Sequence, residues 1–330
     1  MLRLAFFVAA GVALGAPTPA EEPAPIIDVH LHAVPVAGQG PPPQAICAPF
    51  TSWPWRDPRS TPEQFAAFMF KDVGRWCAKP LWSPLADAES LERTLEILRR
   101  RNVRGAVSGD SAILDRWIQA DPHRLWRAEC GPVPELRQAI GSGKVQVVAE
   151  CAPQYEGLSP DDPSLEPLFA LAEEKDVPLG IHLGPGPPGA PYLPGGSRYE
   201  MKLSNPLALE KVLVRHPKMR LWVMHAGWPL ADEMLGLLYA HPQVHVDVGV
   251  IVYGWPRAEF YGYLKRLVEA GFVDRVMFGS DQMIWPEAIE RAIESIEDAP
   301  FLTAEQKRAI LHDNAARFLR LDEKDDLPRR

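Results

Sequence analysis

Short apolar runs rich in β-branched residues recur along the chain and alternate with longer amphipathic segments. The first run, IIDVHLH, alternates apolar and polar side chains with the period of two that is typical of a strand. Similar runs follow at intervals to the end of the chain. The pattern predicts eight strands, at residues 26–32, 103–109, 124–130, 145–151, 178–184, 220–227, 244–250 and 275–281.

Segments with helical spacing of apolar residues separate most of these strands. Repeated strand–helix units imply a parallel sheet with right-handed crossovers. Eight units in a chain of 330 residues favour an α/β fold of one domain, a (β/α)8 TIM barrel. A doubly wound open sheet is the alternative, but the chain lacks the glycine-rich loop that usually follows its first strand. The predicted helices lie at residues 88–102, 164–176, 205–217, 229–242, 258–272 and 303–319, and those between strands two, three and four are less clear.

Two long segments interrupt the alternation. Residues 33–88 form an insertion after strand 1 that contains four tryptophans, many prolines and two cysteines. Residues 184–206 form a Gly/Pro-rich loop after strand 5. Both follow the carboxyl end of a strand, the face on which a barrel builds its active site. Their aromatic content favours a substrate lid over a purely structural loop.

The first 20 residues have the pattern of a signal peptide, with an early cation, an apolar run that is too short to span a bilayer, and small residues near Ala20. We therefore expect an exported protein, periplasmic or secreted, whose mature domain covers residues 21–330. The net charge of −8 argues against nucleic acid as a partner. Residues 21–330 contain no apolar run long enough for stable membrane insertion. We expect a small-molecule substrate and leave homo-oligomer formation open.

Export permits disulfides among the four cysteines. Cys47 and Cys77 share the first long loop, and we predict a bond between them. Cys130 and Cys151 end neighbouring strands. We expect them to lie close without bonding, because adjacent barrel strands impose their own Cβ geometry.

Side chains that can bind metal ions stand at the ends of five predicted strands. In a strand, residues at i and i+2 share a face, so Asp28, His30 and His32 are expected to point one way and Ile27, Val29 and Leu31 the other. Charged groups after apolar runs are costly to bury unless they are paired or coordinated. At the mouth of a barrel the strand ends converge, and this predicts a metal site. The candidate ligands are His30, His32, Glu150, His182, His225 and Asp281.

The segments DVHLH, GIHLG, VMHAGWP, VMFGSDQ and ILHDNAARFL resemble motifs of the amidohydrolase superfamily, in its amidohydrolase-related branch of metal-dependent TIM-barrel hydrolases. The resemblance covers about residues 26–321. It implies that His30, His32 and His182 are metal ligands, and that Asp281 is both a ligand and the general base. By the same resemblance, His225 is either a ligand of a second metal or a catalytic imidazole.

Two patterns within this superfamily differ in the number of ions. Decarboxylase-like members hold one zinc, and two-metal members bridge two ions with a strand-four Glu or carboxylated Lys. Glu150 stands at that strand end, either as a bridge or as a hydrogen-bond partner of a ligand. We prefer one Zn²⁺ and leave a second divalent ion open.

The resemblance favours a hydrolase that uses a metal-bound hydroxide on a small amide, lactone or ester. Zinc lowers the pKa of bound water towards about 7, and Asp281 would accept the proton and pass it to the leaving group. The alternative is a zinc-dependent decarboxylase of a small unsaturated or aromatic acid. Asp28 is the expected partner that fixes an imidazole tautomer, while His245 and Asp247 are left outside the predicted site. The expected substrate contacts are Arg198, Tyr199, Trp228 and Gln282.

Overall fold

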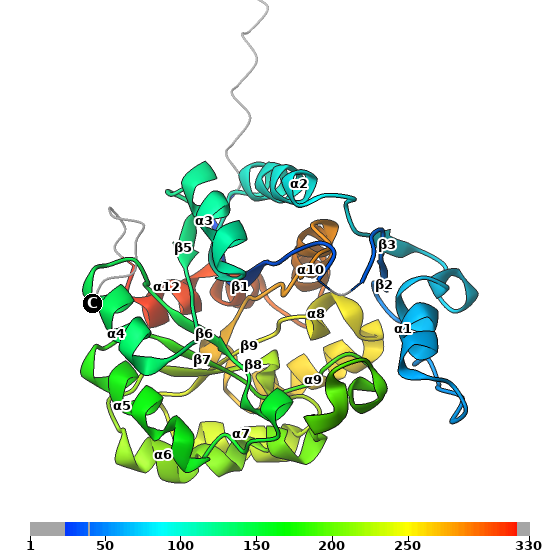
Figure 1. Ribbon diagram of the computed structural model, residues 1–330. Coiled ribbons are helices and arrows are strands. Elements are labelled where there is room, and N and C mark those ends of the chain that lie inside the picture. Colours follow the sequence, from blue (N-terminus) through cyan, green and yellow to red (C-terminus); the bar gives the residue numbers. More distant parts are fainter. Residues whose placement is uncertain (1–23, 39, 322–330) are drawn as a thin grey trace, which may run out of the picture.

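Eight short parallel strands surround the centre of the molecule, and helices form a ring outside them (Figure 1). The structure, a computed structural model, describes residues 24–38 and 40–321. The predicted signal peptide at residues 1–20 lies outside these residues. The TIM barrel and all eight predicted strands are confirmed. The barrel strands are β1 (Ile26–Ala33), β4 (Val103–Gly109), β5 (Leu125–Arg127), β6 (Val148–Cys151), β7 (Leu179–His182), β8 (Leu221–Met224), β9 (His245–Asp247) and β10 (Val276–Met277).

Two sheets together close the barrel. One has the order β1-β4-β5 and the other β10-β9-β8-β7-β6. At one seam, the backbone N–H of Val29 donates to Phe278 O at 3.0 Å and that of Asp281 donates to His30 O at 2.7 Å. At the other, β5 and β6 meet through an isolated parallel bridge between Ala128 and Val147. Four backbone hydrogen bonds cross this seam, from the N–H groups of Gln146 and Val147 to Arg127 O, from Glu129 N–H to Val147 O and from Ala149 N–H to Glu129 O.

Amphipathic helices cover the outside of the barrel. The helix from residue 287 to 297 was missed in the sequence, although its buried Ala and Ile residues follow helical spacing. In the described residues no helix is long and apolar enough to cross a membrane. The helices that follow the barrel strands are α2 (Asp87–Arg100), α3 (Ser111–Ala120), α4 (Val133–Gly141), α5 (Glu166–Glu174), α6 (Glu210–Arg215), α7 (Ala231–Ala240), α8 (Ile251–Gly254), α9 (Arg257–Glu269), α10 (Glu287–Glu297), α11 (Ala304–Arg308) and α12 (Asn314–Leu319).

A bulge in β1 changes which side chains face the lumen. The register of β1 against β4 shifts between Asp28 and Leu31. Ile27 and Val29 consequently pack in the lumen cluster with residues such as Trp126 and Trp222, whereas Leu31 packs in the cluster that includes the surrounding helices. The predicted alternation along IIDVHLH was therefore wrong for the first half of the strand. A one-residue shift moves every later side chain to the opposite face, and here it brings His30 and His32 into the lumen.

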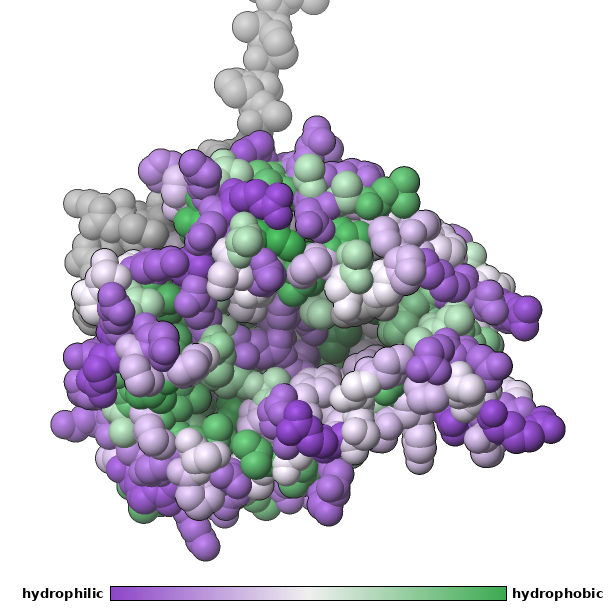
Figure 2. All heavy atoms as spheres, in the orientation of Figure 1, coloured by the Kyte–Doolittle hydropathy of each residue, from purple (hydrophilic) through white to green (hydrophobic). Residues whose placement is uncertain are grey.

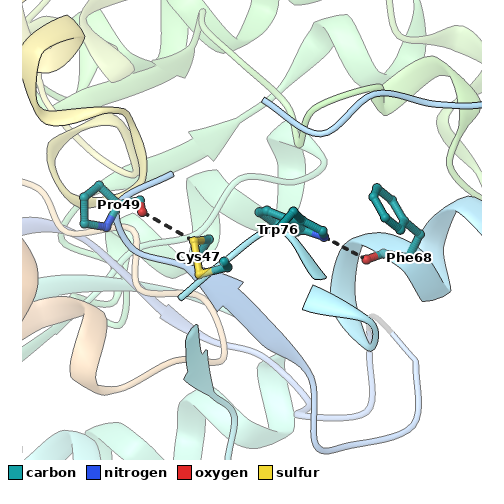
Figure 3. Close-up of a disulfide and its surroundings, with 5 residues drawn as sticks. Cys47, Pro49, Phe68 and Trp76 are labelled. Carbon is teal, nitrogen blue, oxygen red and sulfur yellow. Dashed lines mark hydrogen bonds between the residues drawn. A yellow bond between two sulfur atoms is a disulfide. The ribbon is translucent and has the colours of Figure 1, made fainter. Parts of the chain in front are cut away.

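The long insertion after β1 forms a small unit beside the barrel. It contains the antiparallel pair β2 (Ala45–Cys47) and β3 (Pro80–Trp82) and the helix α1 (Pro62–Phe70). A disulfide joins Cys47 to Cys77, as predicted, and the nearby Trp76 Nε1 donates to Phe68 O at 3.2 Å (Figure 3). The bond links the two ends of the insertion, so the unit is held together covalently as well as by its strand pair.

A second disulfide joins Cys130 to Cys151. The prediction that these residues stay unbonded was wrong. Backbone pairing between the two segments continues to Glu129, and Cys130 lies one residue beyond it, so the ladder geometry of paired strands does not constrain that cysteine. The bond crosses the seam between β5 and β6 and lies next to Glu150. It adds a covalent link to the backbone hydrogen bonds of this seam.

We predict that this second disulfide stabilises the β5–β6 seam specifically. Replacing both Cys130 and Cys151 by Ala should lower the free energy of unfolding by about 3 kcal/mol, the chain-entropy value for a loop of this length. It should also accelerate hydrogen exchange of the amides of Glu129 and Ala149, which bond across the seam. The matched control replaces Cys47 and Cys77 by Ala and should leave exchange at the seam unchanged. Equal exchange at these amides in both double variants would contradict the prediction.

Candidate active site

Six metal-ligand-type side chains meet at the carboxyl ends of the barrel strands. His30 and His32 come from β1, Glu150 from β6 and His182 from the last residue of β7, while His225 directly follows β8 and Asp281 lies four residues after the end of β10. All are buried except Glu150, whose side chain is 17% exposed. A register shift in β6 between Val148 and Cys151 accompanies the position of Glu150, as the β1 bulge does for the histidines. The structure thus brings together every ligand candidate that the sequence named.

Glu150 lies at the centre of four imidazoles. Its Oε2 is 3.6 Å from His30 Nε2 and 3.3 Å from His32 Nε2. Its Oε1 is 3.4 Å from His182 Nε2 and 3.7 Å from His225 Nε2. One carboxylate therefore faces two pairs of histidines, one pair with each oxygen.

Asp281 faces the same centre from the opposite seam of the barrel. Its Oδ1 is 3.0 Å from His32 Nε2 and 3.8 Å from His30 Nε2, and its Oδ2 is 3.8 Å from His225 Nδ1. Asp281 and His225 both have left-handed backbone angles, with φ of 53° and 58°. Such strain in residues other than glycine is characteristic of functional sites. It turns the chain sharply at two strand ends, and both side chains reach inward.

The donor set fits a divalent cation. Buried polar atoms almost always have a hydrogen-bond partner, yet His30 Nε2, His32 Nε2, His225 Nε2 and Asp281 Oδ1 have none. Nitrogen and carboxylate oxygen donors at this density suit Zn²⁺ and other transition metals. Three overlapping trios each place their ligand atoms within 4.8 Å of one another: His30, His225 and Asp281; His30, His32 and Glu150; and Glu150, His182 and His225.

Asp247, which the sequence analysis left out, orients this centre. Its Oδ2 is 3.2 Å from His30 Nδ1 and accepts from Trp222 Nε1 at 3.0 Å. Its Oδ1 accepts from the backbone N–H groups of His225 at 3.0 Å and Gly249 at 2.8 Å. Burial opposes its charge, but the His30 imidazole and these donors outweigh burial and lower the pKa of Asp247 to about 2. An ionised carboxylate here fixes the His30 ring so that Nε2 points at the centre.

Asp28 does not have the role predicted for it. Because of the β1 bulge, its carboxylate stays on the other side of the strand from the imidazoles. Its Oδ1 accepts from the backbone N–H groups of His30 and Ser280, each at 3.0 Å. Burial raises the pKa of Asp28 to about 7. It links β1 to the segment after β10 and makes no hydrogen bond to an imidazole ring.

Gln154, also missed in the sequence, contacts His182. It is fully buried in the 3-10 turn η2 (Pro153–Glu156), and its amide nitrogen lies 2.6 Å from His182 Nδ1. Burial, reinforced by the neighbouring His225, lowers the pKa of His182 to about 3. A neutral imidazole is the form that binds metal ions. No pattern in the sequence singles out Gln154, because its position depends on the turn after β6.

A cavity of about 390 Å³ opens beside the cluster. It lies between the carboxyl ends of β4, β5 and β6 and the starts of α3 and α4, and the face shown in Figure 2 is hollowed near its centre, with hydrophilic residues inside. His32 and Glu150 connect the cavity to the six-residue cluster. A substrate in this cavity would therefore contact the candidate metal centre. The polar side chains that line it are His32, Ser108, Ser111, Glu129, Glu135 and Glu150.

None of the four expected substrate contacts is among the residues that line this cavity. Arg198 is exposed and pairs with Glu156 at the surface. Tyr199 is buried and donates to Gly184 O at 3.1 Å, and Trp228 packs 5.1 Å from the ring of Trp255. Gln282 uses both ends of its amide to bind the backbone of His32, at 3.1 and 2.7 Å, so it holds β1 in place. Substrate contact by these four residues stays a prediction.

Comparison with known proteins agrees with this geometry. The sequence model of the amidohydrolase family matches residues 27–321. The chain belongs to the amidohydrolase family. A search of curated proteins found no match to this amidohydrolase.

Solved structures with the same fold are distant in sequence. A dihydroxybenzoic acid decarboxylase from Polaromonas with bound manganese is 12% identical, with a TM-score of 0.59, and 92% of this chain and 99% of that one are covered. A probable 2-pyrone-4,6-dicarboxylic acid hydrolase from Acinetobacter baumannii is 15% identical, with a TM-score of 0.55 and coverage of 89% and 99%. A 4-oxalomesaconate hydratase from Rhodopseudomonas palustris is 18% identical, with a TM-score of 0.53 and coverage of 89% and 95%. At these identities the likeness establishes the fold of the amidohydrolase and leaves its reaction open.

We predict that Asp247 controls metal affinity through His30. In the wild-type protein, Asp247 Oδ2 faces both Trp222 Nε1–H and His30 Nδ1. Asp247→Asn puts an amide NH₂ in its place, so the His30 ring loses its hydrogen-bond acceptor. Metal affinity should fall by about 10- to 100-fold, as for other partners of metal-bound imidazoles. The measurement is metal content after dialysis against graded chelator, with Asp28→Asn as the buried control that touches no ring. A variant with wild-type metal affinity would show that His30 is held by other contacts.

Proposed function

We propose that this amidohydrolase holds a divalent metal centre, with Zn²⁺ as the resident ion, and hydrolyses a small amide, lactone or ester. The observation that carries the proposal is the position of Glu150, which turns one oxygen to His30 and His32 and the other to His182 and His225. His30, His32, His182, His225, Glu150 and Asp281 would hold the metal.

The geometry around Glu150 supports two ions over the single ion that the sequence favoured. A carboxylate whose oxygens face separate histidine pairs is suited to bridge two cations. Two positive ions would also balance the negative charges that converge there, from Glu150, Asp281 and the nearby Asp247. We propose one ion near His30 and His32 and a second near His182 and His225.

Asp281 is proposed as the group that moves the proton. When bound, a divalent ion supplies an acidified water molecule and polarises the carbonyl that is attacked. Asp281 Oδ1 is buried, has no hydrogen-bond partner and faces the centre, so it can accept a proton and return it to the leaving group. Tyr253 holds the residue in place by donating to Asp281 O at 3.0 Å. His225 is held by Asp247 and Gly249 O, which fits a ligand better than a freely turning acid.

Decarboxylation of a small aromatic acid is the second candidate. Its support is that the solved structures of similar fold include decarboxylases, such as the dihydroxybenzoic acid decarboxylase. Against it, the cavity next to the centre is lined by Glu129, Glu135 and Glu150 and, among its lining residues, by no Lys or Arg. A substrate carboxylate would find no cationic side chain there, so we favour hydrolysis.

We further propose that the enzyme acts outside the cytoplasm, in the periplasm or after secretion. Both disulfides support an oxidising compartment, where such bonds persist. The signal-peptide pattern of residues 1–20 supports the same proposal. The proposed partner is a small-molecule substrate, and homo-oligomer formation stays open.

We predict that Glu150 determines the number of bound ions. Wild-type protein should retain about two ions after dialysis, and Glu150→Gln about one, because the amide keeps the shape but loses the bridging charge. The measurement is elemental analysis of purified protein, which also identifies the metal. Glu135→Gln removes a carboxylate from the same cavity without touching the histidines and should keep both ions. A single ion in wild-type protein would contradict the bridging arrangement.

We predict that substrate turnover releases a new carboxylate and no CO₂. A panel of lactones, esters and amides, each in a neutral and a cationic form, with dihydroxybenzoic acid beside them, would be assayed for both products on the metal-loaded enzyme. Asp281→Asn should retain metal and lose about 100-fold in turnover, the usual contribution of a general base. Release of CO₂ from dihydroxybenzoic acid would overturn the hydrolase proposal in favour of the lyase.

A further inference from the structure

One carboxylate on the wall of the cavity carries a negative charge that no cation offsets. Glu135 lines the cavity from the first turn of α4 and is exposed. Among the residues that the structure describes, no Lys or Arg nitrogen lies within 4.0 Å of its carboxylate. The cavity also contains a buried polar atom without a hydrogen-bond partner. His32 is 5% exposed and turns its unpartnered Nε2 towards the same region as Glu150.

The second carboxylate of this wall, Glu129, is already compensated. Arg127 is buried and donates through Nη1 to Glu129 Oε1 at 2.6 Å, while its Nη2 pairs with Asp115. Lys144 lies 4.0 Å from Asp115 and completes a balanced group of two cations and two anions. Both terminal guanidinium nitrogens of Arg127 are therefore engaged, and they are not free to bind a substrate carboxylate. The charge that remains for a ligand on this wall is that of Glu135.

The helix ends that border the cavity do not reverse this balance. Helix α3 begins at the cavity, but the Asp110 carboxylate already accepts from the N–H groups of Ala112 and Ile113 in its first turn. Helix α4 also begins there, with a positive end equivalent to about half a charge. Glu135 in that first turn carries a full negative charge. A negatively charged ligand would thus meet net repulsion on this side.

We propose that the substrate of this amidohydrolase carries a cationic group, of the primary ammonium or guanidinium class, which lies against Glu135 while the reacting bond lies at the end of the cavity formed by His32 and Glu150. The position given to the reacting bond rests on the proposed function, whereas the preference for a cationic group does not. Bound ions would neutralise Glu150 but leave Glu135 charged, so the two ends of the cavity differ in what they attract. Glu135 favours binding of the cationic group, and the reacting carbonyl binds at the end formed by His32 and Glu150.

The test uses three matched probes on the metal-loaded protein. Benzohydroxamates that carry a 4-aminomethyl, a 4-hydroxymethyl or a 4-carboxy group share one metal-binding end and differ only in the charge of the other. Calorimetric titration should give the aminomethyl compound an affinity about threefold above the neutral one and about tenfold above the carboxylate, the scale of one exposed ion pair and one repulsive pair. The preference should shrink at high salt.

Glu135→Gln should reduce the tenfold range to about threefold or less, while the affinity of the neutral probe stays unchanged. The matched control is Glu305→Gln, which removes a Glu from the first turn of α11, outside the cavity, and should preserve the full range. Tightest binding of the carboxylate probe, or a range that Glu135→Gln leaves intact, would overturn the inference. A protein that keeps the cation preference but hydrolyses nothing in the panel would instead overturn the proposed reaction alone.

Discussion

One carboxylate surrounded by four imidazoles is the constraint on which the rest of this structure depends. Glu150 lies within 3.7 Å of a nitrogen of each of four histidines. Burying that many ionisable groups is costly unless opposite charges and ligands compensate them. Asp281 and Asp247 supply part of the compensation, and the unpartnered nitrogens that remain are what a metal ion would satisfy. The barrel makes the arrangement feasible because parallel strands deliver side chains from five directions to one mouth.

The sequence was sufficient to predict the ligand candidates but not the orientation of their side chains. Polar residues at the ends of apolar strand runs are visible in the chain, and His30, His182 and Asp281 are such residues. The orientation of His30 and His32 depends on a bulge in β1 and that of Glu150 on a register shift in β6, and both are properties of pairing between strands that are distant in sequence. For that reason Asp28 looked like the partner of an imidazole, while Asp247, which lies on a strand of three residues, did not.

The cysteines and helices show the same limit. Cys47 and Cys77 could be paired because one loop contains both, whereas Cys130 lies beyond the end of β5, and its bond to Cys151 at the end of β6 depends on where the chain runs after the strand. Helix α10 has apolar residues with clear helical spacing, so the local pattern is sufficient to predict it. Local pattern therefore gave the fold and its elements. The details beyond the strand ends, where the chemistry lies, depended on tertiary contacts.

The charge of the loops beyond the strand ends is what can distinguish substrates among proteins of one fold. A barrel fixes where the strand ends converge but not the charge of the loops beyond them, so relatives can act on different substrates with the same framework. Here the segment after β5 contributes Glu129 and Glu135, and it is joined by a disulfide to the residue after Glu150. The wall that would meet the substrate is thus tied covalently to the strand that carries the central carboxylate. Displacement of the segment after β5 would therefore be transmitted to the strand that carries Glu150.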